Sequence, residues 1–276
     1  MSVDGRRRGQ KMLFSIFKRE TYRILHHRPT IVLLLGAILF ALVINGMGGI
    51  YSKTEIQRKY AQSSTMAAIS LGIDISEFKD GTEIEDVILT HQFPTTFKQT
   101  SSGLCWISIL FMAYFICSEY HERGYESMLE HGATKQSIFW VKWVSVSISF
   151  WVVSLFILFI MLFRYTLLKE IPSHSLFRNI LIYSVIVLSH GALCILISFL
   201  FRNILWASGV TFIVILIQSI FSPHGPMQML NNEALWTIAS QTDLIKTAVY
   251  NSAGQLVICT IIACLAFQLM ELKREV

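Results

Sequence analysis

Residues 118–143 read SEYHERGYESMLEHGATKQSIFWVKW and separate two strongly apolar segments of the chain. Zinc proteases place two histidines four residues apart on a helix, with a glutamate directly after the first histidine. Here Tyr125 stands where the second histidine is needed, although His121 and His131 keep the outer spacing of the longer motif. Two ligands without the middle one do not make a catalytic zinc site, so no metal site is predicted.

A short charged helix is the better interpretation of this stretch. Residues 120–131 are enough for about three helical turns. Gly132 predicts the end of this helix, and Thr134 predicts the N-cap of the next one. The helix is either a solvated connection between two spans or a docking helix that inserts an apolar ridge into a partner. The ridge would consist of Tyr125, Met128 and Leu129.

The rest of the chain has the composition of a membrane protein. Of its 276 residues, 53% are hydrophobic and only 15% are charged, which departs from the usual soluble domain. The sequence therefore predicts an all-α, polytopic membrane protein with six transmembrane helices within residues 30–276. The six apolar segments that reach or approach the roughly 20 residues needed to cross a bilayer are residues 30–49, 102–118, 138–163, 179–200, 204–221 and 255–270.

The distribution of lysine and arginine predicts the orientation of the spans. These residues are concentrated before the first span, so the N-terminus is expected to be cytoplasmic by the positive-inside rule. An even number of spans returns the basic tail, LKREV, to the same side. Arg164, Lys169 and Arg178 fall on the predicted outside and oppose this topology. No nucleic-acid partner is expected, since the basic residues flank a span and no recognition module accompanies them.

Three segments outside the spans complete the predicted organisation. Residues 1–29 are expected to be cytoplasmic and to contain an amphipathic helix lying in the membrane interface. Residues 50–101 are expected to form an external loop. Residues 222–254 are expected to form short external or re-entrant helices. The residues of interest on the interfacial helix are Phe14, Phe17, Glu20 and Arg23.

The order of these features resembles that of the permease subunits of type-2 ABC exporters. A basic interfacial helix with a glutamate, FKRETYRILHHRP, precedes a span and an external loop. The second span then ends in E-x-x-E-x-G, formed by Glu119, Glu122 and Gly124, and LEHGATKQSIFWVKW and four more spans follow. Such permeases often have Thr or Ser after the glycine and Pro near the end of the loop. Tyr125 and the HGATK turn depart from that pattern.

The resemblance implies that residues 119–135 form a cytoplasmic coupling helix that contacts a separate ATPase. Lys142, early in the third span, matches the same pattern. The residues implied in ATPase coupling are Glu119, Glu122, Gly124, Glu126, Met128, Leu129, Glu130, Gly132, Thr134 and Lys135.

The resemblance also implies the partners of this chain. A dimeric membrane domain, made of two copies or of one copy with a related permease, would contact two cytoplasmic ABC ATPase subunits in the bacterial cytoplasmic membrane. The chain has no GxxxxGK[ST] phosphate loop. It is therefore not expected to be an enzyme itself, and no cofactor is expected in this chain because ATP and Mg²⁺ would bind the partner.

Few ionisable side chains lie in the spans, which favours a hydrophobic or amphipathic cargo such as a peptide antibiotic or bacteriocin, a drug or a lipid-linked molecule. His190, Gln218 and Asn45 are the candidates for the substrate path. His190 and Lys142 can equally have structural roles within the membrane. The alternative functions are a non-transporting receptor or assembly scaffold, and an intramembrane enzyme that uses His121, His131 or His190. The scarcity of paired catalytic groups in the spans opposes the enzyme.

Overall fold

A computed structural model describes residues 3–26, 84–167, 173–222, 224–236 and 242–269, together with Ile31, Val32, Leu35, Gly36 and Leu39. All regular structure in these residues is helical, as the sequence predicts.

Five helices are long and apolar enough to cross a membrane, which confirms a multi-pass membrane protein. The predicted first span, residues 30–49, lies outside the described residues except for five positions, so the sixth span stays a prediction. Asn45 and residues 50–83 also lie outside them. The five helices are α5 (Ile84–His121), α7 (Lys135–Leu167), α8 (Ser173–Phe201), α9 (Ile204–Phe221) and α12 (Thr242–Leu269).

Two helices extend into segments that the sequence places outside the spans. Helix α5 begins at Ile84, so residues 84–101 of the predicted external loop are helical and continuous with the span that follows. Helix α12 begins at Thr242 and includes residues 242–254 of the segment predicted to be external or re-entrant. Earlier in that segment, two short helices do form, α10 (Pro226–Leu230) and α11 (Glu233–Trp236).

The extension of α5 is explained by contact with protein. Phe97 is fully buried, with its ring centroid 4.5 Å from that of Trp236 in α11 and 6.3 Å from that of Tyr183 in α8. Asn231, which follows α10, accepts a hydrogen bond of 2.7 Å from Ser102. The short helices thus cover this part of α5. A hydropathy window requires a long apolar run, so it misses polar helical turns that pack on other helices.

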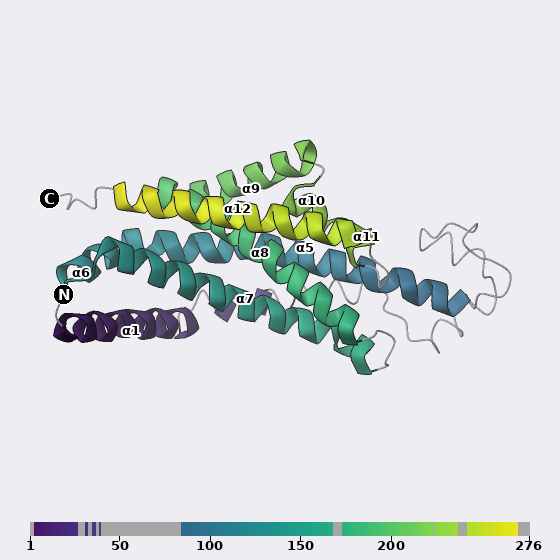
Figure 1. Cartoon of the computed structure of the whole chain (residues 1–276), viewed down its shortest axis with the longest axis horizontal. Helices are drawn as coiled ribbons and strands as arrows, with labels where there is room; N and C mark the ends of the chain where they lie inside the picture. The colour runs from purple at the N-terminus through teal and green to yellow at the C-terminus, as the bar shows by residue number, and fades with distance from the viewer. Residues whose placement is uncertain are drawn as a thin grey trace.

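Helix α8 is the centre of the bundle, where it contacts α5, α7, α9 and α12 (Figure 1). Its candidate span is 78% buried, whereas those of α9 and α12 are 17% and 28% buried. The outward side chains of α9 are large and apolar, as Trp206, Phe212 and Ile220 illustrate. This contrast is expected when lipid or another subunit, and not water, surrounds α9 and α12.

One end of the bundle gathers the segments that sequence analysis singled out. Helix α1 (Val3–His26) and helix α6 (Gly124–Glu130) both lie there, and α12 ends there at Leu269 (Figure 1). Lys135, the first residue of α7, donates a hydrogen bond of 3.1 Å to the carbonyl of Gln268. The turn between α8 and α9 lies at the same end, since the Arg202 guanidinium is 5.5 Å from the centre of the Tyr120 ring.

Candidate functional site

The charged stretch after α5 is not one continuous helix. Helix α5 ends at His121, and Arg123 takes the left-handed conformation with φ 55° and ψ 25° before α6 begins at Gly124. The prediction of about three uninterrupted turns over residues 120–131 is therefore wrong. Of the predicted coupling segment, residues 119–135, Glu119 belongs to the last turn of α5, and Lys135 belongs to α7.

Gly124 is required by the close approach of α6 to the end of α5. A Cβ atom on Gly124 would lie 2.7 Å from Cδ of Glu119 and closer still to Oε2. Only glycine leaves room for the buried carboxylate there. The chain therefore turns at Arg123 and folds α6 back over Glu119, which a pattern of local helix propensity does not show.

The local signals at the end of α6 are confirmed. Gly132 has φ 88°, in the left-handed region that suits glycine after a helix, and its N–H donates to the carbonyl of Leu129 at 2.9 Å. Thr134 caps α7, because its hydroxyl oxygen accepts a hydrogen bond of 3.2 Å from the backbone N–H of Ser137. The end of α6 and the start of α7 are thus fixed by short, sequence-local interactions.

The apolar side of α6 faces the bundle of its own chain. Tyr125 and Met128 are buried, and Leu129 is partly buried. The Tyr125 ring packs edge-on against Phe267 of α12, with ring centroids 5.4 Å apart. Its hydroxyl donates a hydrogen bond of 3.2 Å to the carbonyl of Ile116. Burial raises the pKa of Tyr125 well above its ordinary value, so the hydroxyl keeps the proton that it donates.

This orientation corrects the predicted docking ridge. Tyr125 and Met128 cannot anchor a partner, since their side chains are 1% and 3% exposed. The outer surface of α6 and its flanks is polar instead, and we call it the α6 outer face. The α6 outer face consists of Glu122, Glu126, Glu130, His131, Gly132 and Thr134, of which Glu126 is partly buried and the others are exposed.

Helix α1 packs against α7, whereas the sequence predicts a helix that lies in the membrane interface. Ile16, Glu20 and Ile24, spaced four residues apart, form its buried stripe. Phe14 is 71% exposed, and Phe17 is partly buried. The difference arises because charged residues of α1 find partners inside the protein, where hydropathy alone would not place them.

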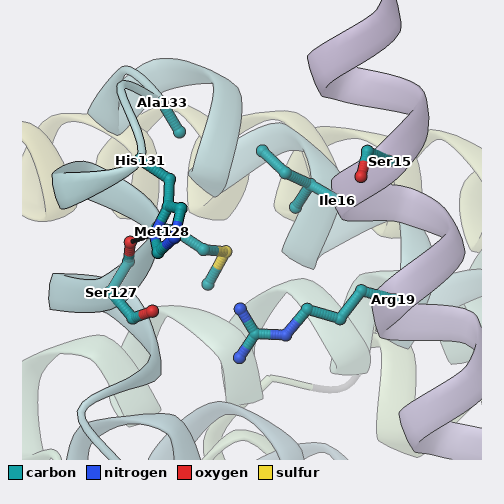
Figure 2. A pocket seen from close by; sticks show the side chains of 7 residues that line it. All are labelled: Ser15, Ile16, Arg19, Ser127, Met128, His131 and Ala133. Atoms are coloured by element: carbon teal, nitrogen blue, oxygen red, sulfur yellow. Dashed lines mark hydrogen bonds between the residues drawn. The ribbon is translucent and has the colours of Figure 1, made fainter.

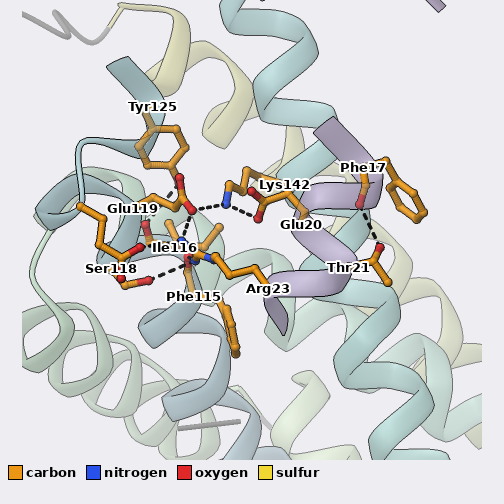
Figure 3. Close-up of polar contacts among 11 residues, drawn as sticks. Phe17, Glu20, Thr21, Arg23, Phe115, Ile116, Ser118, Glu119, Tyr125 and Lys142 are labelled. Carbon is orange, nitrogen blue, oxygen red and sulfur yellow. Dashed lines mark hydrogen bonds and ion pairs between the residues drawn. The ribbon is translucent and has the colours of Figure 1, made fainter. Parts of the chain in front are cut away.

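Four charged side chains from three helices form what we call the ion cluster: Glu20 and Arg23 of α1, Glu119 of α5 and Lys142 of α7 (Figure 3). Lys142 pairs with Glu20, and its Nζ lies 3.0 Å from Oε1 of Glu119. Arg23 pairs with the same Glu119 oxygen. The side chains of Glu20, Glu119 and Lys142 are 0–1% exposed, and that of Arg23 is 13% exposed.

Arg23 also binds the end of α5 through its other guanidinium contacts. It donates hydrogen bonds to the carbonyl of Phe115 at 3.1 Å and to the hydroxyl of Ser118 at 3.2 Å. Its Nη1 lies 3.2 Å from Oε2 of Glu122, which is half exposed. A planar guanidinium that reaches several acceptors is suited to fixing one geometry between two helices.

The ion cluster balances two carboxylates with two cations, which is the condition under which charges can be buried. Its hydrogen bonding is incomplete, however. Oε1 of Glu20, Oε2 of Glu119 and Nε of Arg23 are buried and make no hydrogen bond within the described residues. A buried network with unused donors and acceptors can form alternative pairings when its helices shift.

Sequence analysis identified every member of the ion cluster and missed their pairing. Glu20 and Arg23 were assigned to an interfacial helix, and Glu119 and Lys142 to a coupling element. Opposite charges in or beside otherwise apolar helices were the available signal, because such charges are usually paired.

Of the two substrate-path candidates that the structure describes, His190 lies in the interior of the bundle and Gln218 is partly buried. His190 is fully buried, and its Nδ1 donates to the carbonyl of Ile186 at 2.9 Å. Gln218 of α9 donates to Gln255 of α12 at 3.3 Å, and Gln255 donates to the carbonyl of Ser189 in α8 at 3.3 Å. These bonds connect three spans beside His190, and substrate contact stays a prediction.

A family model described as "ABC-2 family transporter protein" matches residues 100–267. The match runs from α5 to α12 and includes Glu119, α6 and Lys142. No curated protein gives a match.

Proposed function

This chain belongs to the family of ABC-2 transporter proteins, and from that premise we propose that it is the membrane-spanning permease subunit of an ATP-driven exporter. Membership and the five apolar helices make it a multi-pass membrane component of a transporter. The family also implies that it works with an ABC ATPase subunit. ATP and Mg²⁺ would bind that subunit, since this chain has no phosphate-loop motif.

The α6 outer face is the surface proposed to receive the ATPase. It lies at the end of the bundle, and its carboxylates Glu122, Glu126 and Glu130 suit a basic groove on the partner. Charged contacts of this kind set the orientation and rate of docking more than they set affinity. In the proposed topology this end, with both termini, faces the cytoplasm of a bacterium.

The ion cluster is the observation that carries the proposal. Helix α6 folds back over Glu119 at Gly124, and Glu119 pairs with Arg23 of α1 and Lys142 of α7. A displacement of α6 by the ATPase would therefore act on the end of α5, on α1 and on the start of α7 together. Coupling requires that the ATPase contact α6 differently in its ATP-bound and ATP-free states.

The cargo proposed for this permease is hydrophobic or amphipathic, such as a peptide antibiotic or bacteriocin, a drug or a lipid-linked molecule. Large apolar side chains cover the outward surfaces of α7, α9 and α12, as Phe156, Phe212 and Ile258 illustrate. A second copy or a related permease would complete the path on one of these surfaces. His190 and Gln218 are the described polar candidates for contact with this cargo.

The test is co-purification of the chain with a candidate ABC ATPase subunit. We expect Glu126→Lys to weaken recovery of the ATPase severalfold, because it reverses charge on the α6 outer face. The matched control is Asp243→Lys at the start of α12, whose side chain is 94% exposed. Equal recovery with both variants, at equal membrane insertion, would show that α6 is not the docking element.

A further inference from the structure

A pocket of about 480 Å³ opens between α1 and α6, and of its lining residues only His131 belongs to the α6 outer face. Its polar lining residues are Ser15 and Arg19 of α1, with Ser127 and His131 on the side of α6. Its apolar lining comes from Ile16, Met128 and Ala133. Figure 2 shows Arg19 extending from α1 toward Met128 and His131, into the space between the two helices.

The lining has the chemistry of an anion site. The residues that line it include no carboxylate, whereas Arg19 supplies a full positive charge and two serines supply hydroxyl donors. Arg23 and Lys142 belong to the ion cluster. The ion pairs of that cluster, as found among the described residues, do not include Arg19. The guanidinium of Arg19 is therefore available to bind a phosphate with two parallel hydrogen bonds.

His131 favours a ligand that carries a hydrogen-bond donor. Its Nδ1 lies 2.7 Å from the carbonyl of Ser127, so Nδ1 carries the proton and donates it. In the neutral ring Nε2 is then an acceptor. A ligand that combines a phosphate with a hydroxyl group satisfies both Arg19 and His131, and a phosphoglycerol headgroup has this combination.

The level of the pocket relative to the bilayer favours a lipid as the source of that headgroup. Tryptophan side chains collect where a bilayer meets water. Trp140 in the second turn of α7 and Trp206 in the first turn of α9 are exposed, and both helices begin at the end of the bundle that holds the pocket. His131 and Ala133 directly precede α7. The pocket is thus at headgroup level, where basic pockets bind anionic lipids.

We propose that the pocket between α1 and α6 binds the headgroup of an anionic glycerophospholipid, with Arg19 on the phosphate and His131 accepting a hydrogen bond from the glycerol hydroxyl. The apolar floor of Ile16 and Met128 contacts the glycerol backbone and first methylenes of the lipid. The bound lipid contacts both α1 and α6. The position of α6, the predicted ATPase-contacting helix, therefore depends on the lipid composition of the membrane.

The test titrates the full-length chain in nonionic detergent with phosphatidylglycerol or phosphatidylcholine and counts bound lipid by native mass spectrometry. We expect Arg19→Gln to weaken phosphatidylglycerol binding about tenfold, since it removes a charge-assisted contact to phosphate. Lys18→Gln is the matched control, because the neighbouring Lys18 is also exposed but does not line the pocket. His131→Phe should reduce the preference for phosphatidylglycerol over phosphatidylcholine while keeping an aromatic ring.

Three results would overturn this assignment. An equal loss of phosphatidylglycerol binding in Lys18→Gln and Arg19→Gln would show that the lipid is attracted to the basic helix as a whole and not to this pocket. Displacement of the lipid by soluble glycerol phosphate at the same concentration would assign the pocket to a water-soluble phosphate compound. If Arg19→Gln left lipid binding unchanged but weakened ATPase recovery, the pocket would be assigned to an acidic side chain of the ATPase. The lipid measurement uses no ATPase, so its outcome is independent of the docking test.

Discussion

Glu119 is the residue on which the end of the bundle depends most. Its Oε1 contacts both Arg23 and Lys142, and the backbone of α6 covers its carboxylate at Gly124. Removal of one member of a buried ion pair leaves its partner uncompensated, which costs far more than the net value of the pair. The residues around Glu119 therefore differ in predictable ways in their tolerance of substitution.

Glu119→Gln should lower the free energy of unfolding by about 3–5 kcal/mol, because two buried cations lose a shared carboxylate. Thermal unfolding of the purified protein in detergent measures this loss. Glu122→Gln is the control, since Glu122 is half exposed and its only ion pair among the described residues is with Arg23, at 3.2 Å. Its effect should be about 0–1 kcal/mol. Similar losses for the two variants would contradict the central place of Glu119.

Gly124→Ala should destabilise the protein and weaken the packing of α6, because the added methyl group would meet the buried Glu119 carboxylate. Gly254→Ala in α12 is the matched control, since no atom lies within 4 Å of its Cβ position. That change should be neutral or stabilising by up to about 1 kcal/mol, as alanine favours a helix. Thermal unfolding and protease cleavage at Arg123 compare the two variants. If Gly124→Ala were as stable as Gly254→Ala, α6 would not be packed against Glu119.

Among the helices, α1 differs most from its prediction. The sequence predicted a helix held by lipid, whereas Ile16, Glu20 and Ile24 are buried against the protein. The exposed Phe14 and Tyr22 leave a separate surface of α1 that suits the membrane interface. Helix α1 therefore has two attachments, one to α7 and α5 through the ion cluster and one proposed with lipid.

The attachment of α1 to α7 predicts strong coupling between Glu20 and Lys142. Glu20→Gln and Lys142→Gln should each be destabilising, and the double variant should lose less than the sum of the two. The coupling energy should exceed about 1 kcal/mol, because each single change leaves a buried charge without its partner. Thermal unfolding of the four proteins completes the cycle. Additive losses would mean that the two side chains act independently.

For the whole molecule, the sequence predicted the parts of the fold that depend on local or bulk properties. Hydropathy located five described spans, because lipid-facing helices must be apolar along most of their length. Gly132 and Thr134 predicted the end of α6 and the cap of α7, because these roles need only neighbouring residues.

The parts that the sequence did not predict depend on contacts between distant residues. Arg23 is 96 positions from Glu119, and Glu20 is 122 positions from Lys142. No periodicity relates such pairs. The break at Arg123 follows from the packing of Gly124 on Glu119, and the early start of α5 follows from its packing against α10 and α11. Each of these features needs the tertiary arrangement before it can be inferred.

We propose that the ion cluster transmits movement of α6 to the spans, and ATP turnover of the reconstituted permease–ATPase complex measures this transmission. Arg23→Lys keeps the positive charge near Glu119 but cannot keep every guanidinium contact to Phe115, Ser118 and Glu122. We predict that this variant recovers as much ATPase as the unaltered chain, since every residue of the α6 outer face is kept. We also predict that the permease-dependent acceleration of ATP hydrolysis falls severalfold. Full acceleration in Arg23→Lys would contradict transmission through the ion cluster.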